Sequence, residues 1–195
     1  MAGRPGLNSI APDGPPQEQP LVRVAILADT HGFLDPRIAA RVGGCDYAVH
    51  AGDVGNASVL EAMRPRRGLV VVSGNNDLPT KWPEGEAELL AGLPSEGTLE
   101  LPGGCLSVVH GDRVTPVAKR HARLRAAYPH ARAIVYGHSH RLVCDLEEVP
   151  WVLNPGAAGR ARTYGGPSCL ILTARHGSWR LDSLRFDPLS PRRPA

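Results

Sequence analysis

The stretch VRVAILADTH (residues 22–31) leads from a buried-strand pattern directly into two side chains that can hold a ligand. Its first six residues are aliphatic apart from Arg23, which is typical of a strand covered on both faces. Asp29 and His31 follow at positions i and i+2, so their side chains point the same way from an extended or turning segment. This stretch therefore predicts a buried strand that ends in a pair of candidate ligands.

Polar residues follow four further apolar runs in the same manner. The runs at residues 47–50, 69–73, 106–110 and 133–136 have the strand pattern, and the segments that end or follow them are GD (52–53), GNND (74–77), HGD (110–112) and GHSH (137–140). In open α/β sheets the carboxyl ends of the strands face one crevice. We therefore expect all five segments to converge on one pocket, although they are far apart in the sequence.

Helical patterns lie between several of these runs. An Asp-Pro pair at 35–36, the capping box SVLE at 58–61 and a Thr-Pro pair at 115–116 predict helices that continue to about residues 42, 63 and 128. The later runs at 151–153, 169–173 and 179–186 follow one another without a helix, which favours antiparallel pairing. The sum predicts an α/β layered domain with one mixed sheet or two sheets.

Composition places the chain among single-domain globular proteins. It has 195 residues, of which 42% are hydrophobic and 21% charged. Residues 1–20 and 188–195 hold many Pro and polar side chains, so we expect two flexible tails around a folded domain at 21–187. The net charge of +3 is too small for a dedicated nucleic-acid binder. The four widely spaced cysteines predict free thiols, and the sequence shows neither a membrane-length apolar run nor a secretory signal, so we expect a cytoplasmic protein without a membrane partner.

The candidate ligands combine carboxylate, imidazole and amide oxygen. This mixture suits divalent transition metals better than magnesium or calcium, which prefer all-oxygen sites. Six or seven protein ligands are too many for one tetrahedral ion, but they suit two ions bridged by a carboxylate and a hydroxide. Two dications among few carboxylates attract an anion and stabilise charge at phosphorus, so the ligand set predicts phosphoester cleavage.

Together, these segments resemble the calcineurin-like metallophosphoesterase superfamily, whose pattern is Asp-x-His, Gly-Asp, Gly-Asn-x-Asp or Glu, His, and Gly-His-x-His. The match covers residues 22–160, and Asn-Pro-Gly at 154–156 is similar to a segment of the small single-domain phosphodiesterase branch from bacteria and archaea. The resemblance implies an α/β fold, a four-layer α-β-β-α sandwich in which two mixed β-sheets are flanked by helices.

The same resemblance implies an enzyme that hydrolyses a small phosphoester, more specifically a phosphodiester, by attack of a hydroxide that bridges two metal ions. Manganese is the expected metal, with nickel, iron, cobalt and zinc as alternatives. The implied ligands are Asp29, His31 and His140 for one ion and Asn75, His110 and His138 for the other, with Asp53 as the bridge; Asp53, Asn75 and His110 are also the expected catalytic residues.

The sequence departs from the family pattern at Asn76, where many members have a histidine that protonates the leaving group and the small branch often has cysteine. A neutral amide cannot supply that proton at neutral pH. We therefore expect activated esters to be cleaved far better than alkyl esters. Asp112 and Ala157 also differ from residues common in the branch, but neither position is an implied metal ligand.

Several neighbouring residues have two interpretations each. Asp77 either orients a ligating imidazole or caps the turn into the next segment, and Arg160 and Arg162 either bind a substrate phosphate or lie in a solvated loop. His50 is favoured as a satisfied strand histidine and Asn56 as a helix cap. The segment KWPE (81–84) either covers the pocket mouth or packs locally.

Two further hypotheses concern partners. The basic helix with Lys119, Arg120, His121, Arg123 and Arg125 lacks interleaved aromatic residues, so we interpret it as a solvated face and expect no nucleic-acid partner. His121, His130 and His176 are taken as surface residues. The alternative to an enzyme is a non-catalytic protein-binding scaffold, because a subunit of the eukaryotic retromer coat shares the fold without catalysis. The complete ligand set favours the enzyme, and the sequence leaves homo-oligomerisation open.

Overall fold

A computed structural model describes residues 21–189; the expected tail at 1–20, and residues 190–195 of the tail expected at 188–195, lie outside the described residues. The five strand patterns that carry the candidate ligands form strands as expected. They are β1 (Val22–Leu27), β2 (Tyr47–Ala51), β3 (Gly68–Val72), β5 (Gly104–Val109) and β6 (Ala133–Tyr136). The other strands are β4 (Glu96–Leu101), β7 (Leu142–Asp145), β8 (Trp151–Pro155), β9 (Ser168–Ala174) and β10 (Trp179–Arg185).

The strands form two five-stranded sheets, with the orders β10-β9-β1-β2-β3 and β4-β5-β6-β8-β7. Both sheets are mixed. In the first, β1, β2 and β3 run parallel, whereas β9 is antiparallel to β1 and β10 is antiparallel to β9. In the second, β5, β6 and β8 run parallel, whereas β4 and β7 pair antiparallel with β5 and β8. Each sheet therefore has a parallel centre whose carboxyl ends can carry a site.

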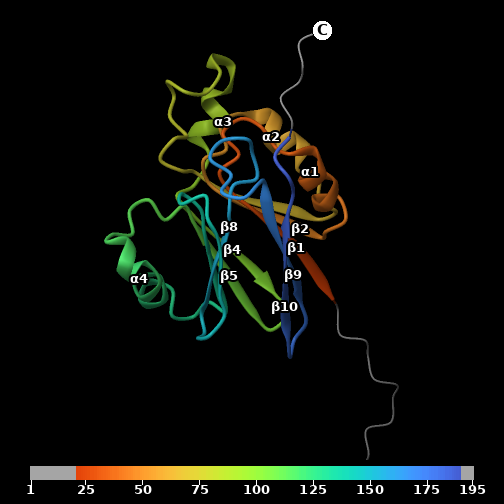
Figure 1. Ribbon diagram of the computed structural model, residues 1–195, viewed down its shortest axis with the longest axis vertical. Helices are drawn as coiled ribbons and strands as arrows, with labels where there is room; N and C mark the ends of the chain where they lie inside the picture. The colour runs from red at the N-terminus through yellow and green to blue at the C-terminus, as the bar shows by residue number, and fades with distance from the viewer. Residues whose placement is uncertain (1–20, 190–195) are drawn as a thin grey trace, which may run out of the picture.

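Helices cover the outer faces of the two sheets (Figure 1). The main core lies between the sheets and contains Val24 and Ile26 of β1 and Leu106 and Val108 of β5. The second core lies between the first sheet and the helices α1 (Pro36–Val42), α2 (Ala57–Ala62) and α3 (Ala87–Ala91), and the third lies between the second sheet and α4 (Arg120–Ala127). This arrangement confirms the expected α/β fold, the four-layer sandwich of two mixed sheets.

Two helix starts differ from their predicted positions. Asp35 caps α1 as expected, since its side chain accepts a hydrogen bond from the backbone of Arg37. For α2 the capping box at 58–61 was the wrong signal: Asn56 is the cap, and its side chain accepts from the backbone N–H of Val59. An Asn side chain one residue before the helix satisfies this donor directly, which confirms the cap interpretation of Asn56.

The helix predicted after Thr115 and Pro116 is α4, and it begins later than expected. Residues 117–119 form a single 3₁₀ turn, and α4 starts at Arg120. Thr115 and Pro116 precede this turn, and no side chain among the described residues caps the turn or α4.

The antiparallel expectation for the late strands is correct for β9 and β10 but wrong for residues 151–153. These residues belong to β8, which pairs parallel with β6 and antiparallel with β7. The error arose because β7 was not recognised: its four residues are only partly buried and carry no buried-strand pattern. The half-exposed strand β4 and the short helix α3 were missed for the same reason.

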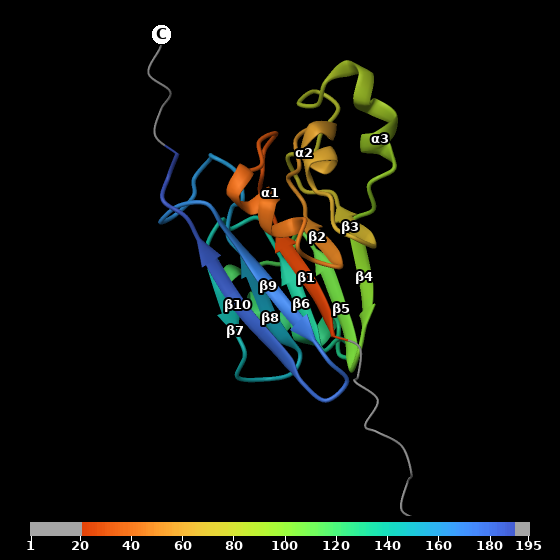
Figure 2. The same ribbon diagram turned by 90° about the vertical axis from the view of Figure 1, so that its right-hand side faces the viewer.

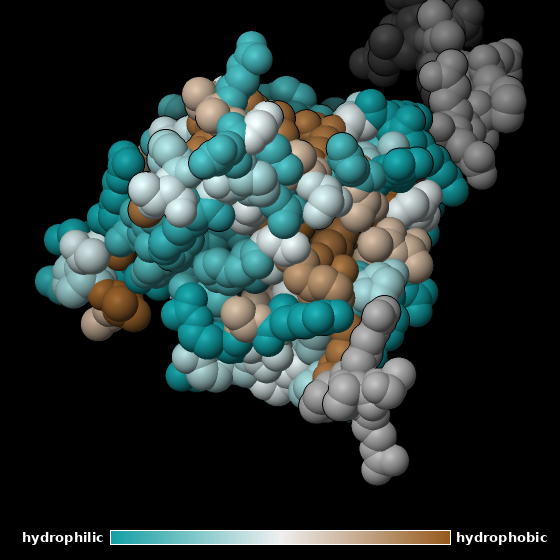
Figure 3. Space-filling model, turned by 90° about the horizontal axis from the view of Figure 1, so that it is seen from above, coloured by the Kyte–Doolittle hydropathy of each residue, from teal (hydrophilic) through white to brown (hydrophobic). Residues whose placement is uncertain are grey.

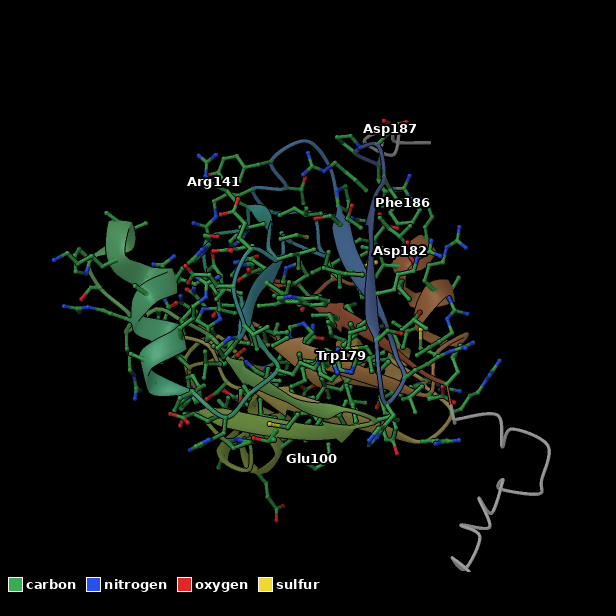
Figure 4. The ribbon with its side chains drawn as sticks, turned by 90° about the horizontal axis from the view of Figure 1, so that it is seen from below. Glu100, Arg141, Trp179, Asp182, Phe186 and Asp187 are labelled. Atoms are coloured by element: carbon green, nitrogen blue, oxygen red, sulfur yellow. The ribbon has the colours of Figure 1, made fainter. Side chains whose placement is uncertain are left out.

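Within the described residues, all four cysteines are free thiols, as expected. No helix among these residues is long and apolar enough to cross a membrane. The lower end of the sandwich is closed by apolar packing, where the rings of Trp151 and Trp179 lie edge to face and Trp179 is buried (Figure 4).

Candidate metal centre

The candidate ligands meet at the upper end of the sandwich, where β1 ends (Figure 2). Backbone hydrogen bonds hold the loops together there. The N–H of Asp29 donates to Gly52 O at 3.0 Å, the N–H of His31 donates to Asp53 O at 2.9 Å, and the N–H of Gly137 donates to His110 O at 3.0 Å. In the view from above, hydrophilic residues gather on the left half of this surface (Figure 3). The convergence expected from the strand ends is therefore present.

One group of donors lies in the loops that follow β1, β2 and β6. Asp29, His31, Asp53 and His140 each offer one ligand atom, and these atoms all lie within 4.8 Å of one another. His31 Nε2 lies 3.1 Å from His140 Nε2, and His140 Nε2 lies 3.6 Å from Asp29 Oδ1. Two imidazoles and two carboxylates at this spacing form a donor set that suits a divalent transition metal.

A second group of donors lies beside the first. The side-chain oxygen of Asn75 is 3.1 Å from His110 Nε2 and 2.9 Å from His138 Nδ1. The rings of His110 and His138 stand edge to face, with their centroids 5.3 Å apart. All seven residues that the sequence singled out as metal ligands are thus brought together, in the two groups implied by the family pattern.

Asp53 connects the two groups through its two carboxylate oxygens. Its Oδ2 lies 3.7 Å from His31 Nε2, and its Oδ1 lies 3.4 Å from His110 Nε2. The side chain is buried. A carboxylate placed this way faces one donor group with each oxygen.

Hydrogen bonds to the backbone fix how two of the imidazoles are presented. His110 Nδ1 lies 2.8 Å from Ala51 O, and His140 Nδ1 lies 3.0 Å from Ala161 O. A carbonyl oxygen can only accept, so each Nδ1 carries the proton and each Nε2 offers a lone pair to the site. Such contacts orient metal-ligating histidines in many proteins.

Backbone conformation also marks this site. Among the described residues, the non-glycine residues with positive φ are Asp29, His31, Asp53, His138, His140 and Arg162, with φ between 47° and 63°. This left-handed conformation is costly for such side chains and persists where the surrounding structure enforces it, most often at functional sites. Five of these six residues are candidate metal ligands. A sequence motif gives no sign of this strain.

Close packing of backbone explains the glycine before Asp53. A Cβ on Gly52 would lie 2.6 Å from His110 Nδ1, and Gly52 has a φ of 87°. Any other side chain would displace the His110 ring or change the turn. The Gly-Asp spacing of the motif therefore follows from the approach of two loops.

The electrostatics indicate that a cation belongs in the first group. Burial raises the pKa of Asp29 to about 7, although the nearby His110 opposes the shift. Asp29 Oδ2 is buried and has no hydrogen-bond partner among the described residues. Burial likewise lowers the pKa of His140 to about 4. A buried carboxylate oxygen without a donor, beside imidazoles that remain neutral, is the environment that a bound metal ion would satisfy.

The second group has the opposite character. Burial opposes the charged forms of Asp53 and His110, but their mutual attraction and hydrogen bonding prevail. The pKa of Asp53 therefore lies below its usual value and that of His110 above it. Asp53 is held as a carboxylate, as a metal ligand must be.

Asp77 does not orient an imidazole, so this interpretation is corrected. Its carboxylate accepts from the backbone N–H groups of Val54, Gly55 and Gly74 at 3.2, 3.0 and 2.8 Å. It also accepts from Trp82 Nε1 at 3.0 Å, and Trp82 is buried in the core beneath the first sheet's helices. The bond to Gly74 is the expected turn cap, and the others tie the loop after β3 to the loop of Asp53.

Asn76 contacts Asp53 directly. Its backbone N–H and its side-chain Nδ2 donate to the two oxygens of Asp53, both at 2.8 Å. The exposed Lys81 donates to the Asn76 side-chain oxygen. Lys81 belongs to the segment KWPE (81–84), within which the sequence assigned no separate role to this lysine.

The two arginines in question lie differently. Arg162 Nη2 is 3.0 Å from His140 Nε2, so its guanidinium reaches the first donor group. The guanidinium of Arg160 lies 3.6 Å from the centre of the Phe33 ring, a stacking contact at the surface. Arg162 is therefore in place for an anion at the site, whereas Arg160 packs against an aromatic ring.

Two other histidines have partners of their own. His50 is buried, with Nε2 2.9 Å from Thr30 Oγ1 but Nδ1 without a partner among the described residues, so it is only half satisfied. Burial lowers the pKa of His50 to about 4, so it stays neutral behind the loop of Asp29 and His31. His121, expected at the surface, is partly exposed and has two partners: Nδ1 lies 2.7 Å from Asp145 Oδ2, and Nε2 lies 3.2 Å from the Tyr136 hydroxyl.

The basic helix is only partly a solvated face. Arg120 is buried and donates to Val114 O at 3.3 Å, and Arg125 Nη2 lies 2.7 Å from Asp145 Oδ1. These two guanidinium groups therefore hold α4 against the second sheet. Their charges are engaged within the fold.

Several known proteins are similar to this chain. A curated relative, a probable metallophosphoesterase of Methanocaldococcus jannaschii, is 26% identical over 140 residues, which cover 69% of this chain and 67% of the relative. A crystal structure from Streptococcus pneumoniae, described as a conserved predicted phosphoesterase, has a TM-score of 0.63 at 22% identity and covers 89% of this chain and 95% of its own.

Two further solved structures share the fold. An archaeal phosphodiesterase has a TM-score of 0.59 at 20% identity and covers 83% of this chain and 99% of its own. Vps29 of Entamoeba histolytica, crystallised with Zn²⁺, has a TM-score of 0.61 at 17% identity and covers 85% of this chain and 99% of its own.

The decisive comparison is with a family model. The model of the calcineurin-like phosphoesterase superfamily domain matches residues 22–177, which include β1 to β9 and all seven candidate ligands. The chain belongs to the calcineurin-like phosphoesterase superfamily.

Proposed function

We propose that this protein is a phosphodiesterase that depends on two divalent metal ions. The observation that carries the proposal is the position of Asp53, whose two oxygens face two separate donor groups at 3.7 and 3.4 Å. A shared carboxylate between two sets of nitrogen and oxygen donors is the arrangement that a two-metal site requires.

The residues fit such ions on chemical grounds. Asp29, His31 and His140 would hold one ion and Asn75, His110 and His138 the other, with Asp53 between them. The unpartnered oxygen of Asp29 is open for coordination, and the Nε2 atoms of His110 and His140 face the site because their Nδ1 atoms bind backbone carbonyls. Bound divalent ions would supply Lewis-acid chemistry, activating a water and offsetting charge at phosphorus. Mixed N and O donors suit divalent transition metals, and we propose manganese, with nickel, iron, cobalt or zinc as alternatives.

The chain's own groups would then bind and position the ester. Arg162, 3.0 Å from His140 Nε2, would donate hydrogen bonds to phosphate oxygens, since a guanidinium pairs well with that geometry. Asn76 would hold Asp53 in place through its two hydrogen bonds. The shared fold of an archaeal phosphodiesterase and the lack of an acid at Asn76 support a diester substrate.

The test is metal content together with turnover. The full chain, stripped of metal and reloaded with manganese, should bind about two ions per chain and hydrolyse bis-p-nitrophenyl phosphate. The Asp182→Asn variant is the control, because Asp182 is an exposed carboxylate on β10 (Figure 4). Binding of fewer than two ions, or two ions without turnover of any phosphoester, would contradict the proposal.

A second candidate function is a protein-binding scaffold, which is favoured by the shared fold of Vps29. The same experiment separates the two functions. A scaffold with metal bound would hydrolyse no phosphoester, and the wild type and Asp53→Asn would be equally inactive.

A further inference from the structure

A cavity of about 140 Å³ lies directly beside the second donor group. Asn75 and His110 form one wall. The other walls come from Ser73, from Ser95 and Glu96 at the start of β4, from the loop at 111–114 after β5, and from Tyr128 at the end of α4. A water molecule occupies about 30 Å³ in the liquid. The cavity therefore has room for a small organic group next to the proposed metal site.

Strand pairing fixes the place of Glu96 in this cavity. Glu96 pairs across β4 and β5 with Val109, the residue immediately before His110. Burial, together with the neighbouring Glu96 carboxylate, raises the pKa of Tyr128 to about 12. The phenol thus keeps its proton at neutral pH and can donate a hydrogen bond.

The charges of the lining decide what the cavity can bind. Arg113 Nε lies 4.0 Å from Asp112 Oδ2, and Glu96 adds a further acidic side chain to the lining. A negative wall repels an anionic group, and an apolar group would leave the polar lining unpaired. Carboxylate and serine oxygens instead accept hydrogen bonds from hydroxyl groups.

We propose that this cavity binds the alcohol part of a phosphodiester and selects an uncharged, polyhydroxylated alcohol, of glycerol or pentose size, through Glu96. The proposal rests on the proposed phosphodiesterase function, because the neighbouring donor group places phosphorus beside the cavity. It deepens that function by naming the substrate class: diesters of a polyol, rather than diesters with a second phosphate or an alkyl chain.

Two esters with the same leaving group test the proposal. They are the p-nitrophenyl phosphodiesters of glycerol and of 1-propanol, which differ only in two hydroxyl groups. With the manganese-loaded full chain, kcat/KM should be about tenfold higher for the glycerol ester, the size expected of a hydrogen bond to a charged group. In Glu96→Gln this ratio should fall to within about threefold of one, because a neutral amide accepts more weakly.

The matched control is Glu100→Gln, which makes the same change on the same strand. Glu100 lies four residues along β4, about 13 Å away at ~3.3 Å per residue, outside the cavity lining (Figure 4). The glycerol-to-propyl ratio should be unchanged in this variant. Thermal unfolding of both variants should match that of the wild type, since both side chains are exposed.

A second measurement separates the phosphodiesterase proposal from the cavity assignment. Calorimetry gives the affinities of the manganese-loaded chain for glycerol 3-phosphate and for propyl phosphate. If neither ester is hydrolysed but glycerol 3-phosphate binds about tenfold tighter in a manner that requires Glu96, the cavity assignment stands and the phosphodiesterase function fails. If the wild type shows no preference in turnover or binding, or if Glu96→Gln retains the preference, the cavity assignment is overturned.

Discussion

Asn76 donates two hydrogen bonds to Asp53, one from its backbone N–H and one from its side chain, both at 2.8 Å. The amide oxygen of Asn76 accepts from Lys81 on the other side. The side chain is therefore polarised between a cation and a carboxylate. Its role in this fold is to hold Asp53, and it offers no acidic proton to a departing alcohol.

This relationship predicts a steep dependence of rate on the leaving group. Across a series of aryl and alkyl phosphodiesters, kcat/KM should fall strongly as the pKa of the leaving alcohol rises, because a neutral amide cannot protonate the departing oxygen. The measurement is a plot of log kcat/KM against leaving-group pKa. Asn76→His should flatten this plot by supplying an acid, and a flat plot for the wild type would refute the prediction.

Replacement of Asp53 by Asn should remove most activity while the fold persists. The amide lacks the negative charge that both donor groups face, so metal content should drop and turnover of bis-p-nitrophenyl phosphate should fall by at least about a hundredfold. Metal analysis and circular dichroism of the same sample give the two readouts. Asp182→Asn should change neither. Full turnover by metal-replete Asp53→Asn protein would show that Asp53 does not bridge.

The sequence predicted the ligand set because the motif residues follow the carboxyl ends of strands. The sheet topology brings these strand ends to one edge. The pairs Asp29 with His31 and His138 with His140 show this, since a short spacing and a preceding apolar strand suffice to place both side chains. Likewise the apolar runs of β1, β2, β5 and β6 are buried and were recognised without difficulty.

The remaining features depend on long-range contacts that leave no local pattern. Strands β4 and β7 are half exposed and lack a buried run, and Asp77 binds the backbone of a loop more than twenty residues earlier. His121 carries no motif, and only the approach of β7 to α4 gives it Asp145 as a partner. Such partners follow from the tertiary fold, so the sequence could not assign them.

Metal uptake should weaken as the pH falls through neutrality. Burial raises the pKa of Asp29 to about 7, so below that pH a proton occupies the carboxylate and must leave before an ion binds. Each pH unit below about 7 should therefore lower the apparent affinity for manganese by up to about tenfold. Calorimetric titrations at pH 6, 7 and 8 measure this slope. An affinity independent of pH would show that Asp29 is not among the ligands.

Asn154 should govern the order of the His138–His140 loop. Its buried Nδ2 donates to Gly137 O at 2.7 Å and to Ser139 Oγ at 3.1 Å. Asn154→Ala should cost about 1–3 kcal/mol of stability, the penalty for buried groups left unpaired, and should weaken metal binding by about tenfold. Asn56→Ala is the control: loss of this helix cap should cost about 1 kcal/mol without altering metal affinity. Equal metal affinity in both variants would contradict the prediction.

Asp145 should contribute stability that depends on acid pH. Arg125 and His121 both approach its carboxylate at 2.7 Å, and Glu148 lies 3.7 Å from the Arg125 guanidinium. The hydrogen bond from Arg125, aided by that from His121, lowers the pKa of Asp145, although burial opposes the shift. A carboxylate with a lowered folded-state pKa stabilises the fold above its unfolded pKa of about 3.9 and loses that contribution as pH falls through the folded value.

The urea midpoints of wild type and Asp145→Asn should therefore differ most above pH 5 and should converge as the pH is lowered below 4. Asp182→Asn removes an exposed ion pair with Arg180, so its midpoint should stay close to that of the wild type at every pH. A gap between wild type and Asp145→Asn that widened toward low pH would reverse the sign required by the lowered pKa. It would show that the contacts of Asp145 with α4 act through packing rather than through charge.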